Sequence, residues 1–183
     1  MKTRRVCVFC GSTLGSLESF QKAVLMLAAA LIKNDLELVY GGGGTGLMGA
    51  LADEMLRLGG RVTGVIPKAL LAREVGHPSI SEMHVVADML ERKAVMAQLA
   101  DASIALPGGY GTIDELFEML TWLQLQVHEK PVGLLNISNY YDHLLRFLDQ
   151  GVGLGFIRAE HRALLHVDEE PLALLNRLEM TRD

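Results

Sequence analysis

The 183 residues suffice for one domain with a full hydrophobic core, since 50% of them are hydrophobic and 21% are charged. The net charge of −5 and the lack of any Lys/Arg cluster argue against a nucleic-acid polymer or an acidic membrane as the main partner. The apolar stretch after the basic start ends at Gly11, too short for a signal sequence or a membrane span, so we expect a cytoplasmic protein.

Short apolar runs alternate with segments of helical periodicity along the chain. The expected strands cover residues 6–10, 36–40, 61–67, 83–86, 102–106, 132–135 and 164–167. The expected helices cover residues 20–33, 47–58, 89–99, 116–125, 140–149 and 171–179, with Ser19 and Asp88 as N-caps of the first and third. Residues 68–81 lack clear periodicity and are expected to form a surface loop with a single helical turn near Leu70.

This alternation predicts an α/β fold. The expected strands are apolar on both faces and no hairpin turn joins neighbours, which indicates a Rossmann-like, doubly wound, mainly parallel sheet with helices on both faces. We expect residues 1–183 to form a single nucleotide-binding domain. In such sheets the ligand lies beyond the carboxyl ends of the strands. Three glycine-rich turns, at residues 11–16, 41–46 and 107–111, follow strands and can converge there.

Cys7 and Cys10 form a C-x-x-C pair, which can indicate a redox or metal motif. Residues three apart on a strand point to opposite faces, so one disulfide or one metal ion shared by both is geometrically awkward. None of the six histidines has the spacing of a metal-binding motif. We therefore expect two reduced, buried thiols and no metal site.

The stretch from Pro107 to Glu115 has the layout of an anion site, because it follows an expected strand and leads into an expected helix. Glycines let the backbone approach a ligand, and a helix N-terminus offers N–H groups and a positive dipole end to a phosphate. Glu115 is unexpected here, because its charge would repel a bound phosphate unless it acts on the ligand. The candidate phosphate-binding residues of this stretch are Gly108, Gly109, Gly111 and Thr112.

The glycine tract 41–46 allows two interpretations. It can be a tight turn with close helix packing, or it can supply backbone donors to a phosphate or ribose. A P-loop is excluded because no Lys-Ser/Thr follows the glycines, and the next strand ends without the acid that holds a ribose in dinucleotide sites. The candidate phosphate or ribose contacts of this tract and of the first turn are Gly42, Gly43, Gly46, Gly11 and Ser12.

Three motifs in this order resemble the LOG family, the cytokinin riboside 5'-monophosphate phosphoribohydrolases once labelled lysine decarboxylases. The similarity extends from Cys10 to about Phe156, with Leu90 in place of a His found in many members and Asp114 in place of a commoner Glu. The motifs are Gly41-Gly42-Gly43 with Gly46-Leu47-Met48-Gly49, then Met89-x-x-Arg92-Lys93, and then Pro107-Gly108-Gly109-x-Gly111-Thr112-x-x-Glu115.

The resemblance implies hydrolysis of the N-glycosidic bond of AMP or an N6-prenylated AMP, giving the free base and ribose 5-phosphate. It also implies a homodimer with sites near the subunit interface and no required cofactor. Arg92 and Glu115 match the family's catalytic residues. The positions that match its substrate contacts are Glu74, Lys93, Gly109, Tyr110, Gly111, Thr112, Ile113, Asp114 and Thr121.

Several alternatives stay open on sequence alone. Arg92 follows Asp88 by four residues and could be its helical ion-pair partner rather than a catalytic group. Breaking a ribosyl C–N bond develops positive charge at C1', so Glu115 could offset that charge, hold ribose hydroxyls or orient water. Glu74 could be a solvated charge, and the sequence does not choose between plain and prenylated AMP.

The sequence argues against two other functions. The lysine decarboxylase label requires a lysine that binds pyridoxal phosphate, and Lys93, the only lysine in a motif, lies next to Arg92 rather than in a recognisable cofactor pocket. A non-catalytic nucleotide or cofactor carrier on the same fold is the rival interpretation, since fold does not fix function. A carrier has no use for Glu115 beside a phosphate, so the enzyme is favoured.

Overall fold

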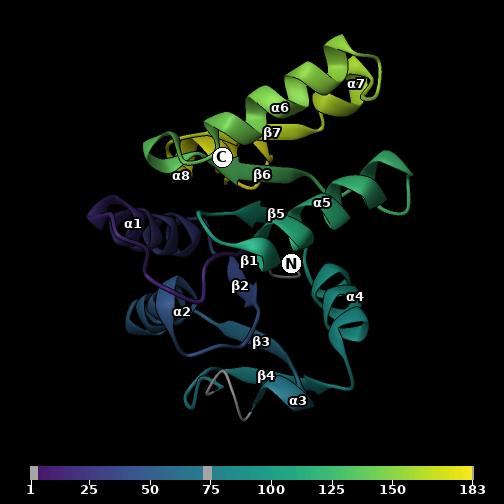
Figure 1. Ribbon diagram of the computed structural model, residues 1–183. Helices are drawn as coiled ribbons and strands as arrows, with labels where there is room; N and C mark the ends of the chain where they lie inside the picture. The colour runs from purple at the N-terminus through teal and green to yellow at the C-terminus, as the bar shows by residue number, and fades with distance from the viewer. Residues whose placement is uncertain (1–3, 72–75, 183) are drawn as a thin grey trace.

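A central parallel sheet organises the structure, a computed structural model that describes residues 4–71 and 76–182 (Figure 1). The strands pair in the order β4-β3-β2-β1-β5-β6-β7, and every neighbouring pair is parallel. Their bounds are β1 Arg5–Phe9, β2 Glu37–Tyr40, β3 Val62–Pro67, β4 Glu82–Val86, β5 Ala102–Ala105, β6 Val132–Leu135 and β7 Leu165–Asp168. The predicted doubly wound α/β fold is confirmed.

Helices cover both faces of the sheet because the strands are apolar on both faces. One core cluster packs α1, α2 and α8 against the sheet, and a second packs α4, α5 and α6 against the opposite face (Figure 1). The helix bounds are α1 Glu18–Lys33, α2 Gly46–Arg57, α3 Lys68–Leu71, α4 Met89–Leu99, α5 Tyr110–Gln124, the 3-10 turn η1 Ile137–Asn139, α6 Asp142–Gly153, α7 Ala159–Arg162 and α8 Pro171–Arg177.

Some helix ends differ from the sequence prediction. Ser19 is not the N-cap of α1, because the helix begins at Glu18 after an extended Leu17, and the Ser19 hydroxyl instead lies 2.8 Å from that of Ser138. Helix α5 begins inside the glycine motif, at Tyr110. The apolar periodicity could not show this, because Tyr110, Gly111 and Thr112 precede the first aliphatic side chain of the helix, Ile113.

The last third of the chain contains two further differences. The predicted helix 140–149 begins later, at Asp142, and continues to Gly153. It follows a turn in which Ser138 and Asn139 take left-handed backbone angles, with φ of 54° and 59°. Helix α7 was not predicted, since its single turn buries no residue and has no apolar periodicity.

Cys7 and Cys10 are buried and form no disulfide, as predicted. They belong to different core clusters, on opposite faces of the sheet. Burial raises the pKa of the Cys10 thiol well above its ordinary value, and the negative charge of Glu115 raises it further. Cys10 is therefore a protonated, unreactive thiol.

The strand order brings two distant loops together. The chain moves outward from β1 through β2, β3 and β4, and then returns to the other side of β1 with β5. The loops that follow β1 and β5 are therefore neighbours at the carboxyl edge, where Gly11 N donates to Pro107 O at 3.1 Å. This reversal point is where ligands bind in open α/β sheets.

Candidate active site

A cavity of ≈ 200 Å³ opens at this reversal point, between the loops after β1 and β5 and the start of α4. We call it the Arg92–Glu115 cavity. It brings together residues from four separate stretches of the chain, including Gly109, Tyr110 and Gly111 of the turn at residues 107–111, which we call the motif loop. Its lining residues are Cys10, Gly11, Ser12, Met48, Met89, Arg92, Gly109, Tyr110, Gly111, Thr112, Asp114 and Glu115.

Arg92 is a buried charge held by backbone carbonyls. Helix α4 begins with Asp88, whose side chain accepts the N–H of Glu91 at 2.9 Å, and this cap places Arg92 in the second turn. Its Nε donates to Val65 O and its Nη2 to Gly41 O, both at 3.1 Å. The side chain of Arg92 therefore binds these carbonyls rather than forming the helical ion pair with Asp88. The planar fork instead lies across the ends of β3 and β2.

Glu115 faces Arg92 across the cavity wall. Glu115 is only 9% exposed, and its Oε1 lies 4.0 Å from Arg92 Nη2. A carboxylate taken out of water is costly unless an opposite charge or hydrogen bonds compensate it, and the guanidinium provides that charge. The cavity therefore contains an ion pair that is nearly closed to bulk solvent.

The motif loop supplies the opposite wall. Gly108 must be glycine, because a Cβ there would overlap Thr112 Oγ1 and lie 2.9 Å from Gly11 N. By contrast, a Cβ on Gly109 or Gly111 would meet nothing within 4 Å, so these two positions border open space. The first N–H groups of α5 have no partner within the helix, and they lie beside this space. The arrangement suits a phosphate at the helix N-terminus, next to the Arg92–Glu115 pair.

Lys93 ties α4 to α5 just outside the lining of this cavity. Its Nζ lies 3.2 Å from Asp114 and 3.1 Å from Glu118. Burial lowers the pKa of Lys93, but the hydrogen bonds and charges of Glu118 and Asp114 outweigh it and raise the pKa above its ordinary value. A lysine that forms a Schiff base needs the neutral amine, so Lys93 does not fit pyridoxal phosphate.

Other predicted site residues lie elsewhere. Gly42, Gly43 and Gly46 are not among the residues that line the cavity, and neither is Ile113, which packs against the core. Thr121 donates to Phe117 O at 2.7 Å and borders a separate, apolar cavity between α5 and α6. Glu74 lies outside the described residues. The roles of all these residues stay predictions.

Sequence reasoning missed three residues of the wall. Cys10, Met48 and Met89 line the cavity, although two of them stand inside motifs. Methionine and a neutral cysteine carry no specific chemical signal, so only their neighbours in the sequence pointed to them. Among the described residues, no group of three or more His, Cys, Asp or Glu side chains could hold a metal ion.

Comparisons with known proteins find a matching family model and similar relatives over most of the chain. A family model described as "Possible lysine decarboxylase" matches residues 48–178. A probable cytokinin riboside 5'-monophosphate phosphoribohydrolase of Oryza sativa is 51% identical, over 96% of this chain and 78% of the relative. A cytokinin riboside 5'-monophosphate phosphoribohydrolase of Arabidopsis thaliana is 47% identical, over 97% of this chain and 84% of the relative.

Solved structures share the fold at much lower identity. The molybdenum cofactor carrier protein of Chlamydomonas reinhardtii is 19% identical, with a TM-score of 0.71 over 97% of this chain and 99% of that one. A molybdenum cofactor binding protein of Rippkaea orientalis is 17% identical, with a TM-score of 0.72 over 98% and 97%. At this distance the likeness concerns the fold alone.

Proposed function

Because this chain belongs to the LOG family of cytokinin riboside 5'-monophosphate phosphoribohydrolases, we propose that it hydrolyses an adenine-type nucleoside 5'-monophosphate in the Arg92–Glu115 cavity. The substrate is an N6-prenylated AMP, AMP, or both, and the products are the free base and ribose 5-phosphate. The observation that carries the proposal is the buried Arg92–Glu115 pair beside the N-terminus of α5.

The phosphate end of the substrate binds the motif loop. Gly109, Gly111 and Thr112 present backbone N–H groups at the start of α5, and the open space at both glycines admits the phosphate oxygens. This contact fixes the distance from the phosphate to Glu115, which lies about one helical turn further along α5. The ribose then lies against the Arg92–Glu115 pair.

Glu115 acts on the ribose. When the C1'–N9 bond breaks, the base leaves with the bonding electrons and takes up a proton, while C1' becomes positively charged until a water oxygen bonds to it. The ionised carboxylate of Glu115 offsets that charge or accepts the proton of the attacking water. Arg92 places its positive charge 4.0 Å from this carboxylate, and its own position is fixed by Val65 O and Gly41 O.

Glu115→Gln tests this proposal. We expect the protein to release base from AMP or N6-isopentenyl-AMP, and the variant to lose at least about 100-fold in kcat, because the neutral amide cannot balance the charge at C1'. Free base and ribose 5-phosphate are measured by chromatography. Glu18→Gln is the control, since Glu18 is an exposed carboxylate on α1 paired with Lys22. Equal turnover of Glu115→Gln and the unchanged protein would refute the mechanism.

The homodimer is also part of the proposal. Apolar side chains beside the cavity are exposed, with Leu90 at 73% and Met89 at 40%, as are Leu125 and Val127 after α5. Such exposed apolar groups favour a protein–protein contact, and a contact through α4 would place it near the site. Sedimentation equilibrium measures the state, and a monomer at micromolar concentration would count against it.

The cytoplasmic location of the protein stays a prediction. Within the described residues, none of the helices has the length and apolar character needed to cross a membrane.

A further inference from the structure

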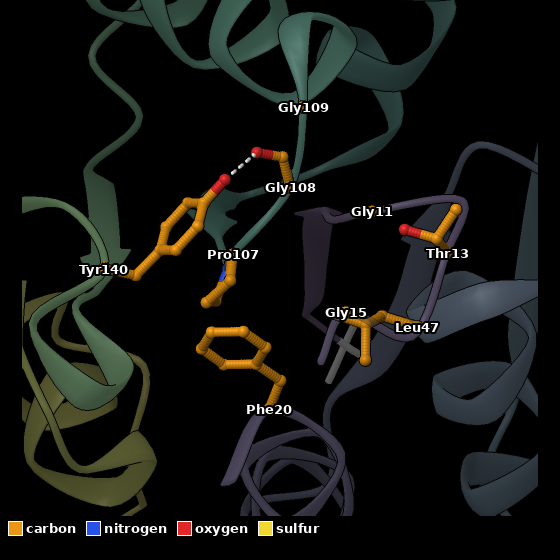
Figure 2. Close-up of a pocket in the computed structure, with 9 residues that line it drawn as sticks. All are labelled: Gly11, Thr13, Gly15, Phe20, Leu47, Pro107, Gly108, Gly109 and Tyr140. Carbon is orange, nitrogen blue, oxygen red and sulfur yellow. Dashed lines mark hydrogen bonds between the residues drawn. The ribbon is translucent and has the colours of Figure 1, made fainter. Parts of the chain in front are cut away.

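A second cavity, of ≈ 220 Å³, lies on the other side of the motif loop. Figure 2 shows its aromatic wall, with Tyr140 pointing at the carbonyl of Gly108 and Phe20 below it. The Tyr140 hydroxyl donates to Gly108 O at 2.7 Å. Gly11 and Gly109 line both cavities, so the loop is a thin partition between them.

The hydrogen bond from Tyr140 sets the direction of one peptide group. In a trans peptide the C=O of one residue and the N–H of the next point in opposite directions, and the described residues contain no cis peptide bond. Because the Gly108 carbonyl points to Tyr140, the N–H of Gly109 points away from it. Away from Tyr140 lies the Arg92–Glu115 cavity, which Gly109 also lines.

The next tyrosine holds the same loop in a different way. Tyr141 is buried, and its hydroxyl donates to Leu106 O at 2.7 Å. The peptide group between Leu106 and Pro107 has no N–H, because proline lacks one. Burial raises the pKa of Tyr141 above its ordinary value, so its hydroxyl stays protonated as a donor. Tyr141 therefore directs no donor into the Arg92–Glu115 cavity.

Aromatic packing and a hydrogen bond to Asn136 hold the two tyrosines in place. Tyr140 packs edge-to-face on Phe20, with centroids 5.6 Å apart, and on Tyr141, at 4.8 Å. The backbone N–H of Tyr141 donates to the Asn136 side chain at 2.7 Å. The left-handed residues Ser138 and Asn139 cost free energy. The turn that contains them places the two tyrosine hydroxyls against Gly108 O and Leu106 O.

We propose that Tyr140 is a positioning residue for substrate phosphate: its hydrogen bond to Gly108 O aims the N–H of Gly109 into the Arg92–Glu115 cavity. This rests on the proposed function, in which the motif loop binds the phosphate. Tyr140 acts through the loop and does not touch the reacting atoms. Its removal should weaken phosphate binding more than it slows the chemical step.

Tyr140→Phe and Tyr141→Phe form a matched pair that tests this role. Each variant keeps the ring and its aromatic contacts and loses one hydroxyl bonded at 2.7 Å to the same loop. We expect Tyr140→Phe to raise KM for AMP and the dissociation constant of ribose 5-phosphate by about 3- to 10-fold, which is what the loss of one hydrogen bond predicts. Its kcat should fall by less than about 2-fold.

Tyr141→Phe should show the opposite balance. We expect it to lower the melting temperature at least as much as Tyr140→Phe, because its hydroxyl is more deeply buried, while KM and the ribose 5-phosphate affinity change by less than about 2-fold. If both variants change stability and KM in parallel, the hydroxyls only hold the fold and the inference is overturned.

The same measurements separate this inference from the proposed function. If the unchanged protein releases no base from AMP or N6-isopentenyl-AMP, the proposed function fails, yet calorimetry with ribose 5-phosphate still compares the two variants. If the protein is active and Tyr140→Phe binds ribose 5-phosphate as tightly as before, the positioning role alone is wrong. If the unchanged protein does not bind ribose 5-phosphate at all, the inference falls as well.

Discussion

The loops at residues 41–46 and 107–111 have the same local pattern of strand, glycines and helix, but their glycines meet different surroundings. In the first loop, a Cβ on Gly41 would overlap Arg92 Nη2, and a Cβ on Gly46 would overlap the backbone of Ser12. In the second, Gly109 and Gly111 face open space. Gly108 of the second loop also packs against protein atoms, but Gly109 and Gly111 leave room for a ligand, which Gly41 and Gly46 of the first loop do not.

The two loops also differ in the groups that their backbones contact. The 41–46 loop turns its carbonyls to the protein, since Gly41 O accepts from Arg92 and Gly42 O accepts from the N–H of His77 at 3.0 Å. The 107–111 loop leads directly into the N-terminus of α5. In the proposed function, the first loop holds the Arg92 side chain and the second presents donors to the substrate. Four substitutions test this contrast.

The largest effect is expected for Gly46→Ala. Gly46 has φ of +64°, and an added Cβ would overlap backbone atoms of Ser12, which cannot move as a side chain does. We expect a loss of about 3 kcal/mol or more in the free energy of unfolding, measured by urea denaturation. A loss below about 1 kcal/mol would show that the first loop is less tightly packed than its geometry indicates.

Gly41→Ala should damage activity more than stability. The added Cβ meets the end of the Arg92 side chain, which can turn aside but then loses its bond to Gly41 O. We expect kcat/KM to fall by about 10- to 100-fold, with about 1 kcal/mol of lost stability. Steady-state kinetics with AMP measure the first and denaturation the second. Full activity of the variant would show that the hydrogen bond from Arg92 to Gly41 O is not needed for the reaction.

Gly111→Ala should show the opposite behaviour. Gly111 lies in the first turn of α5 and borders open space, so alanine should keep or raise the stability by up to about 1 kcal/mol. The new methyl group enters the space assigned to the phosphate, and KM should rise by about 3- to 10-fold. A melting temperature that falls while KM stays constant would reverse the contrast between the loops.

The smallest effect is expected for Asp114→Asn. Asp114 is 58% exposed at the side chain, and Lys93 keeps its second partner, Glu118. We expect at most about 0.5 kcal/mol of lost stability at pH 7. The pKa of Lys93 is raised in the folded protein, so this pairing stabilises fully below its ordinary value of 10.5 and is lost as pH rises through the folded value. Denaturation at pH 7 and pH 11 should therefore give a smaller difference between variant and unchanged protein at pH 11.

The sheet and the motif loop were predictable from local signals. Each strand is a short apolar run, and the glycines before α5 stand directly after one of them. The prediction of Asp88 as an N-cap is confirmed, because its side chain accepts the backbone N–H of Glu91, three residues later. These features depend on residues close in the sequence, so periodicity and capping chemistry identified them.

Contacts between distant segments could not be predicted. Tyr140 looked like the start of a helix, and nothing near it in the sequence shows that its hydroxyl lies against Gly108, 32 residues earlier. The carbonyls that hold Arg92 come from β3 and from the loop after β2, 27 and 51 residues away. The two interpretations of the 41–46 tract stayed equal on sequence alone, since choosing between them requires knowing which atoms face each glycine.

The place of β1 in the sheet has a consequence for biosynthesis. Arg5 at the start of β1 bonds Asp101, 96 residues later, just before β5. A growing chain therefore carries β1 with one free edge until β5 emerges, and the wall formed by the motif loop does not exist before then. In the proposed function nucleotide binds this wall, so it can stabilise the chain only after β5 has folded. An added nucleotide should slow the unfolding of the complete chain and leave a fragment that ends before Pro107 unprotected from protease.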